Sequence, residues 1–95
     1  MYELKCRYDS RNSFYGKAQV QTTRTSVGQT IDLYSYGTLV ASIYDDFEDM
    51  TRKYVYNGKY SQTTTRHQKE FFKQFDLSDD EIKELFKNGE LIKEW

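Results

Sequence analysis

Residues 53–75 read KYVYNGKYSQTTTRHQKEFFKQF, and the spacing of apolar side chains changes within this stretch. Before Ser61, residues 53–56 are rich in strand-forming residues. Asn57-Gly58 is typical of a type I′ turn, whose two central residues both need a positive φ, and residues 59–60 would complete a hairpin. After Ser61 the apolar positions fall at helical spacing, namely His67 (in part), Phe71, Phe72 and Phe75. The stretch therefore predicts a sheet that gives way to a helix.

A second helix is predicted directly after the first. Ser78-Asp79-Asp80-Glu81 has the residues of a complete capping box, and its acids suit the positive end of a helix dipole. Asn88-Gly89 is typical of a helix that stops at a C-terminal glycine. The two helices are expected at 64–75, capped by Thr63 or Thr64, and at 79–88. The last apolar residues, Leu91, Ile92 and Trp95, are expected to fold back onto the core.

Upstream of residue 53 the chain has the pattern of strands. Residues 2–8 alternate strictly, with Tyr2, Leu4, Cys6 and Tyr8 on one face and charged residues on the other. Further strands are predicted over 14–24, with Gly16 as a bulge, and over 30–36 and 39–44. The fold class is therefore α+β, with an N-terminal antiparallel sheet of four to six strands over about 2–60 and two short C-terminal helices.

Length and composition bound the possible architectures. Ninety-five residues form one domain, residues 1–95, with no room for a second core. Of the residues, 37% are hydrophobic and 17% aromatic, including nine Tyr and six Phe. Tyrosine favours strands and keeps a polar tip, so this composition indicates a sheet with one packed face and one decorated face.

Charge is segregated along the chain although the net charge is only −1. The segment 45–50 is acidic, and the segment 51–73 is basic apart from Glu70. The acids of the first segment are Asp45, Asp46, Glu48 and Asp49, and the bases of the second are Arg52, Lys53, Lys59, Arg66, Lys69 and Lys73. Such segregation is typical of charged surface patches, and the acidic segment is a candidate partner-binding site.

Most catalytic and metal-dependent functions lack the residues they need. Cys6 is the only cysteine, so no intramolecular disulfide is possible and a cytoplasmic setting is expected. One Cys and one His cannot build a structural zinc site, and no glycine-rich phosphate loop is present. No signal peptide or stretch of transmembrane length is recognisable. We expect no enzyme activity, no cofactor and no metal.

The start of the first helix has the oddest local composition. Three threonines, Arg66 and His67 gather at residues 63–67. This group could present N–H groups, hydroxyls and a cation to a partner, or it could be simple capping with His67 packed over Phe71. Arg66 and His67 are therefore the second candidate partner-binding group.

Three blocks of the sequence resemble one family. They are SFYGKA at 13–18, LYSYGTLVA at 33–41 and YSQTTTRHQKEF at 60–71. They are similar to an uncharacterised family of short proteins encoded by bacteriophages and mobile elements, and the similarity covers about residues 13–75. The tail from Asp76 onward lies outside this similarity. The resemblance implies a phage accessory protein in a bacterial host cytoplasm and brings no activity or catalytic residue with it.

The expected function is stoichiometric binding to a host protein or ribonucleoprotein complex, as an inhibitor of a nucleic-acid-targeting defence complex. Clustered carboxylates could occupy a basic nucleic-acid channel, as in an anti-CRISPR protein. One alternative is a nucleic-acid-binding accessory or regulatory protein that uses the basic segment 51–73. Another is a homodimeric structural module that pairs through a sheet edge. No membrane partner is expected.

Overall fold

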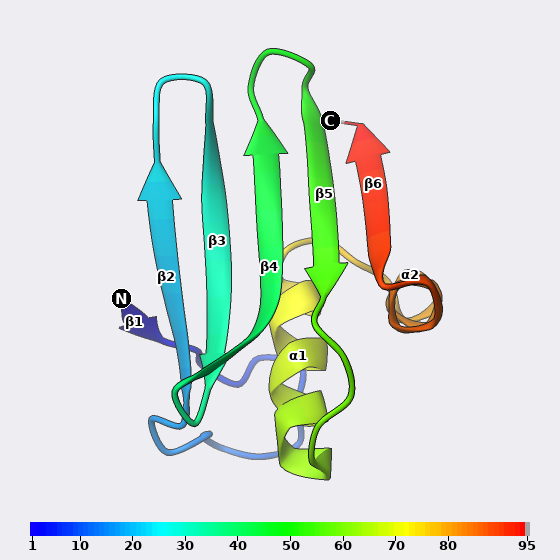
Figure 1. The fold of residues 1–95 in the computed structure, drawn as a ribbon. Helices are drawn as coiled ribbons and strands as arrows, with labels where there is room; N and C mark the ends of the chain where they lie inside the picture. Colours follow the sequence, from blue (N-terminus) through cyan, green and yellow to red (C-terminus); the bar gives the residue numbers. More distant parts are fainter. Residues whose placement is uncertain (95) are drawn as a thin grey trace.

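The computed structural model describes residues 1–94 and has the α+β fold predicted from the sequence (Figure 1). Within these residues five strands precede two helices, and a sixth strand follows them. The strands are β1 (Tyr2–Glu3), β2 (Ala18–Arg24), β3 (Gly28–Ser35), β4 (Thr38–Asp46), β5 (Thr51–Tyr56) and β6 (Glu90–Glu94). The helices are α1 (Gln62–Gln74) and α2 (Asp79–Asn88).

The strands join one antiparallel sheet in the order β1-β2-β3-β4-β5-β6. The first five strands follow one another as a meander, whereas β6 returns from the helices and pairs with β5 (Figure 1). The prediction that the last apolar residues fold back onto the core is therefore right for Leu91 and wrong for Ile92. Leu91 packs against the core, but Ile92 is 60% exposed on the opposite face of the sheet. Trp95 lies outside the described residues.

The two helices cover one face of the sheet and leave the other open (Figure 1). Side chains alternate across a strand, so every second residue of β2–β5 points toward the helices. The core consists of these inward residues, such as Val20, Leu33, Ile43 and Tyr54, together with Phe71 and Phe72 of α1 and Leu85 of α2, all at most 2% exposed.

The N-terminal segment does not form the strand predicted over 2–8. Only Tyr2 and Glu3 form strand pairs with β2, and the chain leaves the sheet after Leu4, whose N–H donates to the carbonyl of Ala18 at 2.9 Å. The buried carboxylate of Glu70 accepts hydrogen bonds from the backbone N–H groups of Tyr8 and Asp9, both at 2.8 Å. Helix α1 thus satisfies backbone groups that a longer strand would have paired, and the loop packs beside the helix.

The type I′ turn predicted at Asn57-Gly58 is wrong. Asn57 does not have a positive φ, and residues 59–60 form no strand. Instead the N–H of Asn57 donates to the carbonyl of Val40 at 3.2 Å, and Gln68 of α1 donates to the carbonyl of Gly58 at 3.2 Å. These tertiary hydrogen bonds lead the chain into α1. A two-residue hairpin does join β3 and β4 at Tyr36-Gly37, where φ is +52° and +82°.

Side-chain caps define where both helices begin. The Ser61 hydroxyl accepts from the N–H of Thr64 at 3.2 Å, so α1 starts two residues before its predicted position. The capping box of Ser78 and Glu81 is present as predicted. Gly89 ends α2 at φ +86°, in the left-handed region that glycine adopts without cost.

Candidate protein-binding surface

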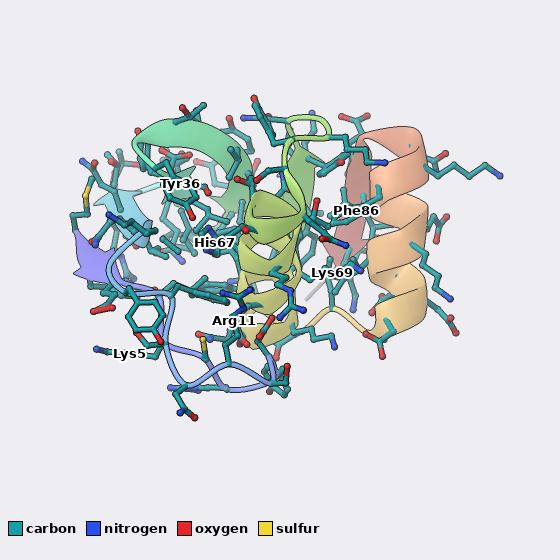
Figure 2. All side chains as sticks on the ribbon, turned by 90° about the horizontal axis from the view of Figure 1, so that it is seen from below. Lys5, Arg11, Tyr36, His67, Lys69 and Phe86 are labelled. Carbon is teal, nitrogen blue, oxygen red and sulfur yellow. The ribbon has the colours of Figure 1, made fainter. Side chains whose placement is uncertain are left out.

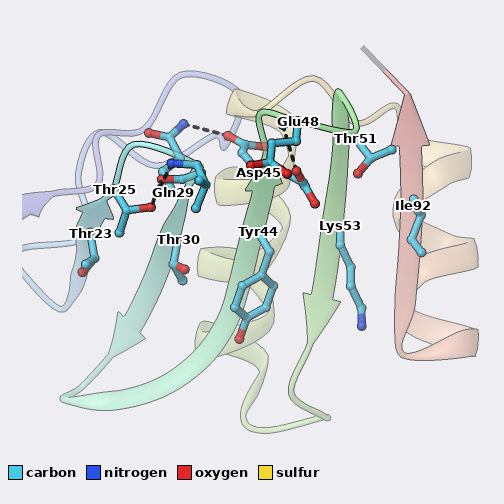
Figure 3. Close-up of a pocket in the computed structure, with 13 residues that line it drawn as sticks. Thr23, Thr25, Gln29, Thr30, Tyr44, Asp45, Glu48, Thr51, Lys53 and Ile92 are labelled. Carbon is cyan, nitrogen blue, oxygen red and sulfur yellow. Dashed lines mark hydrogen bonds between the residues drawn. The ribbon is translucent and has the colours of Figure 1, made fainter.

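The open face of the sheet carries a row of side chains that runs across five strands. Thr23, Thr30, Tyr44, Lys53 and Ile92 lie opposite one another on β2 to β6. Figure 3 shows them along a shallow depression of about 600 Å³. Tyr44 is 46% exposed and Ile92 is 60% exposed. The depression therefore offers a partner two apolar side chains, Tyr44 on one side of Lys53 and Ile92 on the other.

Carboxylates surround this row. Asp32, Asp46, Glu90 and Glu94 occupy outward positions of β3, β4 and β6, and Glu48 and Asp49 lie in the turn between β4 and β5. Lys53 is the one basic side chain in the outward rows of β3–β6, within the described residues, and it pairs with Glu90 at 3.0 Å. We call these six acids the acidic face. Four of the six are on strands of one sheet, so their backbone positions are set before a partner binds.

Asp45 does not belong to this face, which corrects one of the predicted contact residues. It is in β4, not in the turn, and its side chain is buried on the helix side of the sheet. There it accepts from Arg52 at 2.5 and 2.9 Å and from Gln29 at 2.7 Å. Burial raises the pKa of Asp45, but the hydrogen bonds from Arg52 and Gln29 outweigh it, so the pKa is lowered.

The remaining residues of the predicted acidic loop are at the surface, with different tasks. The Asp46 carboxylate accepts from the N–H groups of Glu48 at 2.9 Å and Asp49 at 3.1 Å, and so holds the turn. Glu48 and Asp49 are exposed, and no side-chain hydrogen bond engages their carboxylates within residues 1–94. They are the two acids of the turn that a partner could meet without breaking a contact of the fold.

Arg66 and His67 lie on the helix side of the molecule, away from the acidic face. Arg66 is half-buried and pairs with Asp9 at 3.3 Å. His67 is 1% exposed, with Nδ1 at 2.8 Å from the Ser35 hydroxyl and its ring 4.4 Å from that of Phe14. The His67 side chain is interior, so the six predicted contact residues do not form one surface. The threonines of this segment also serve the fold, since Thr64 is buried 2.9 Å from the Ser35 hydroxyl.

His67 gives a testable pH dependence. Burial lowers its pKa, while Asp9 and Arg11 act in opposite directions. In the unfolded chain a His titrates near about 6.5, so acidification favours unfolding between that pH and the lower folded pKa. We expect the urea midpoint to fall as the pH drops from about 7 to about 5. A His67→Gln variant should show a flatter profile across this range, and an unchanged profile would contradict the assignment.

The basic segment 51–73 does not form one patch either. Arg52 points toward the helices and Lys53 toward the open face, because neighbouring residues of a strand face opposite sides. Arg66, Lys69 and Lys73 follow one another along α1, and Lys59 lies in the loop before that helix. Lys73 pairs with Asp79 of α2 at 2.9 Å. The basic charge predicted to bind nucleic acid is thus divided between β5, the loop at Lys59 and a stripe on α1.

Cys6 is half-buried against the core, and burial raises the pKa of its thiol. Among residues 1–94, no group of three or more His, Cys, Asp and Glu side chains is placed to hold a metal ion. No helix in that range combines the length and apolarity needed to cross a membrane.

Comparison with known protein families finds a match for this chain. Residues 2–88 match the model of a family of unknown function, DUF8033. The chain belongs to this family. No curated protein and no solved structure matches it. The DUF8033 match is wider than the resemblance seen at residues 13–75, and it ends at the last residue of α2. The expectation that the chain leaves the family pattern at Asp76 is therefore wrong, and of the helices and strands within residues 1–94 only β6 lies beyond the match.

The three sequence blocks that suggested a family meet at one place in the fold. Phe14 comes from the first block, Ser35 and Tyr36 from the second, and Thr64 and His67 from the third. His67 contacts Phe14, Ser35 and Tyr36, and Thr64 contacts Ser35. Figure 2 shows Tyr36 beside His67. These blocks therefore encode the packing of α1 against the lower end of the sheet.

Proposed function

We propose that this protein is a phage-type accessory protein that acts by stoichiometric protein binding in a bacterial cytoplasm. Its partner is a host complex that targets nucleic acid, and binding inhibits that complex in the manner of an anti-CRISPR protein. The observation that carries the proposal is the acidic face, where six carboxylates surround Lys53, Tyr44 and Ile92. A channel that binds nucleic acid is lined with basic residues, so this face is complementary to it.

The acidic face also fits the energetics of such a contact. Like charges on one face repel each other, and a basic partner would relieve this repulsion while steering association. Tyr44 and Ile92 supply apolar area in the centre, where contacts contribute most to affinity. An inhibitor of this kind needs no cofactor and no catalytic group, because occupancy of the channel is sufficient.

The test is a pair of charge-reversal variants with the same change in net charge. Glu48→Lys with Glu94→Lys alters the acidic face at two exposed positions. Asp80→Lys with Glu84→Lys alters exposed acids of α2 and serves as the matched control. The readout is transformation of a targeted plasmid into bacterial strains with active CRISPR systems, followed by target cleavage by the purified complex.

We expect the unmodified chain to restore transformation in at least one strain and to block cleavage at about one chain per complex. The acidic-face variant should bind at least about tenfold more weakly, with slower association and a flatter salt dependence. The α2 variant should behave like the unmodified chain. Failure of the unmodified chain in every strain would overturn the proposed target. Equal activity of the acidic-face variant would overturn the proposed surface.

A further inference from the structure

Two turns at the lower end of the sheet have the same sequence and the same backbone. Tyr15-Gly16 joins the N-terminal loop to β2, and Tyr36-Gly37 joins β3 to β4. All four residues have positive φ, at +54° and +75° in the first turn and +52° and +82° in the second. The N–H of Lys17 donates to the carbonyl of Phe14 at 3.0 Å, which closes the first turn. Gly16 is therefore a turn residue and not the bulge predicted from the sequence.

The two turns lie side by side and are rigidly held. The N–H of Tyr36 donates to the carbonyl of Lys17 at 2.8 Å. Phe14, which precedes the first turn, and Ser35, which precedes the second, both contact the buried His67. Figure 2 looks onto this end of the molecule and shows Tyr36 beside His67. The backbone that presents the two tyrosines is thus anchored in the core.

The ring of Tyr36 lies 5.8 Å from that of His67 between centroids, but the turn geometry itself does not favour tyrosine at either position. The first position of a type I′ turn favours Asn, Asp or Gly, and a bulky side chain with positive φ is strained. Burial offers little compensation, because Tyr15 is 78% exposed and Tyr36 is 58% exposed. Strain of this kind concentrates at functional sites. The chain therefore holds two aromatic rings in solvent at a cost to its own stability.

Basic residues lie in the turns and in a segment close to them. Three segments at this end (Figure 1), 13–17, 35–39 and 57–63, contain Lys17 and Lys59 and no acidic residue. Neither lysine pairs with a carboxylate within residues 1–94. Tyr60, in the segment 57–63, is also exposed, at 45%. The carboxylate in contact with these turns, Glu3, is occupied by the N–H of Gly16 at 3.0 Å and by Lys5 at 3.3 Å.

We propose that the two Tyr-Gly turns form a binding site for single-stranded nucleic acid. The rings of Tyr15 and Tyr36 stack on bases, and Lys17 and Lys59 lie against the phosphates. Stacking on aromatic rings beside cations is how proteins hold single strands without reading their sequence. The rigid turns keep the rings in place before binding, which lowers the entropy cost. This site is separate from the acidic face and does not depend on the function proposed above.

The experiment measures fluorescence anisotropy of a labelled oligothymidylate of about 12 nucleotides, with a duplex for comparison, at low salt. Tyr15→Asn and Tyr36→Asn remove a ring and install the residue that the turn prefers. Tyr15→Phe and Tyr36→Phe keep the ring. Tyr44→Thr removes an exposed tyrosine from the open face as the matched control. Because no protein partner is present, failure here and failure of the inhibitor proposal are distinguishable.

Each Asn variant should bind the single strand about tenfold more weakly, while the Phe variants and Tyr44→Thr stay within about twofold of the unmodified chain. The Asn variants should melt at the same temperature or about 2–5 °C higher, since turn strain is relieved. Three results would each overturn the proposal: no binding at low salt, Asn variants that bind normally, or duplex bound as tightly as single strand. If the Asn variants lost only inhibition of a purified complex, the turns would be a protein contact instead.

Discussion

Truncation of Phe72 to Ala is expected to lower the free energy of unfolding by about 3–5 kcal/mol, the range for a buried phenylalanine. Phe72 is fully buried at the junction of α1, α2 and β5. Its ring lies 5.4 Å from Phe71, 6.2 Å from Tyr54 and 6.4 Å from Phe86, between ring centroids. Because every layer of the fold meets this ring, the structure cannot collapse into the space without moving a helix.

A loss of this size matters because a domain of about 95 residues has only roughly 5–14 kcal/mol of stability. Urea denaturation monitored by circular dichroism measures it. Phe75→Ala is the matched control: Phe75 is the C-cap of the same helix but is half-buried, so its truncation should cost less than half as much. If the two variants lost equal stability, or if Phe72→Ala lost less than about 1 kcal/mol, Phe72 would not be the centre of the core.

The helical part of the fold was predictable because its signals are local. The spacing of Phe71, Phe72 and Phe75 and the capping box at Ser78 each act within one or two turns of helix. The structure shifts the start of α1 by two residues, since the hydroxyl of Ser61 and not that of Thr63 or Thr64 caps it. Boundaries depend on which of several neighbouring hydroxyls makes the bond, and composition does not decide that.

The prediction of a strand over residues 2–8 was wrong because the alternating apolar residues pack against the core from a loop. Leu4 is buried and Cys6 packs against the core, but Tyr2 and Tyr8 are at least half exposed. The decisive partner, Glu70, is more than sixty positions away, and its carboxylate accepts two backbone N–H groups of the loop. In the sequence Glu70 is one acid in a basic helix. A contact between residues this far apart in the chain produces no periodic pattern in the sequence.

The candidate surface was predictable only in part for the same reason. A run of acids at 45–49 marks charge in sequence, but strand alternation divides the run between the two faces, with Asp45 inside and Asp46 outside. Glu90 and Glu94 join the face because β6 pairs with β5, an event between segments far apart. The alternation of Glu90, Ile92 and Glu94 was the available signal, but the predicted sheet ended near residue 60 and no strand was predicted after the helices.

Arg52→Ala is the second large expected effect, again about 3–5 kcal/mol, because it leaves a charge buried without its counter-ion. The Asp45 side chain is completely buried and that of Arg52 is 17% exposed. Arg52 also lies over the ring of Phe75, at 5.7 Å from its centroid. Without the guanidinium, Asp45 keeps the hydrogen bond from Gln29 but loses two charged ones. The carboxylate must then stay charged in an apolar site or take up a proton.

The design that isolates this effect is a double-mutant cycle with Asp45→Asn and Arg52→Met. Arg52→Met alone keeps most of the packing over Phe75 and should still be strongly destabilising, because Asp45 remains charged and buried. Adding Asp45→Asn should recover much of the loss, since no charge is then left inside.

The pH dependence of stability gives the direction of the Asp45 pKa shift independently. The pKa of Asp45 is lowered in the fold, so its contribution is present above about 3.8 and is lost as the pH falls through the folded pKa. In Arg52→Met burial should dominate and raise that pKa, so on mild acidification from neutral pH the variant should lose less stability than the unmodified chain, in which the titration of His67 acts alone. A single variant as stable as the unmodified chain, with an unchanged acid limb, would show that the pair contributes no more than a surface salt bridge.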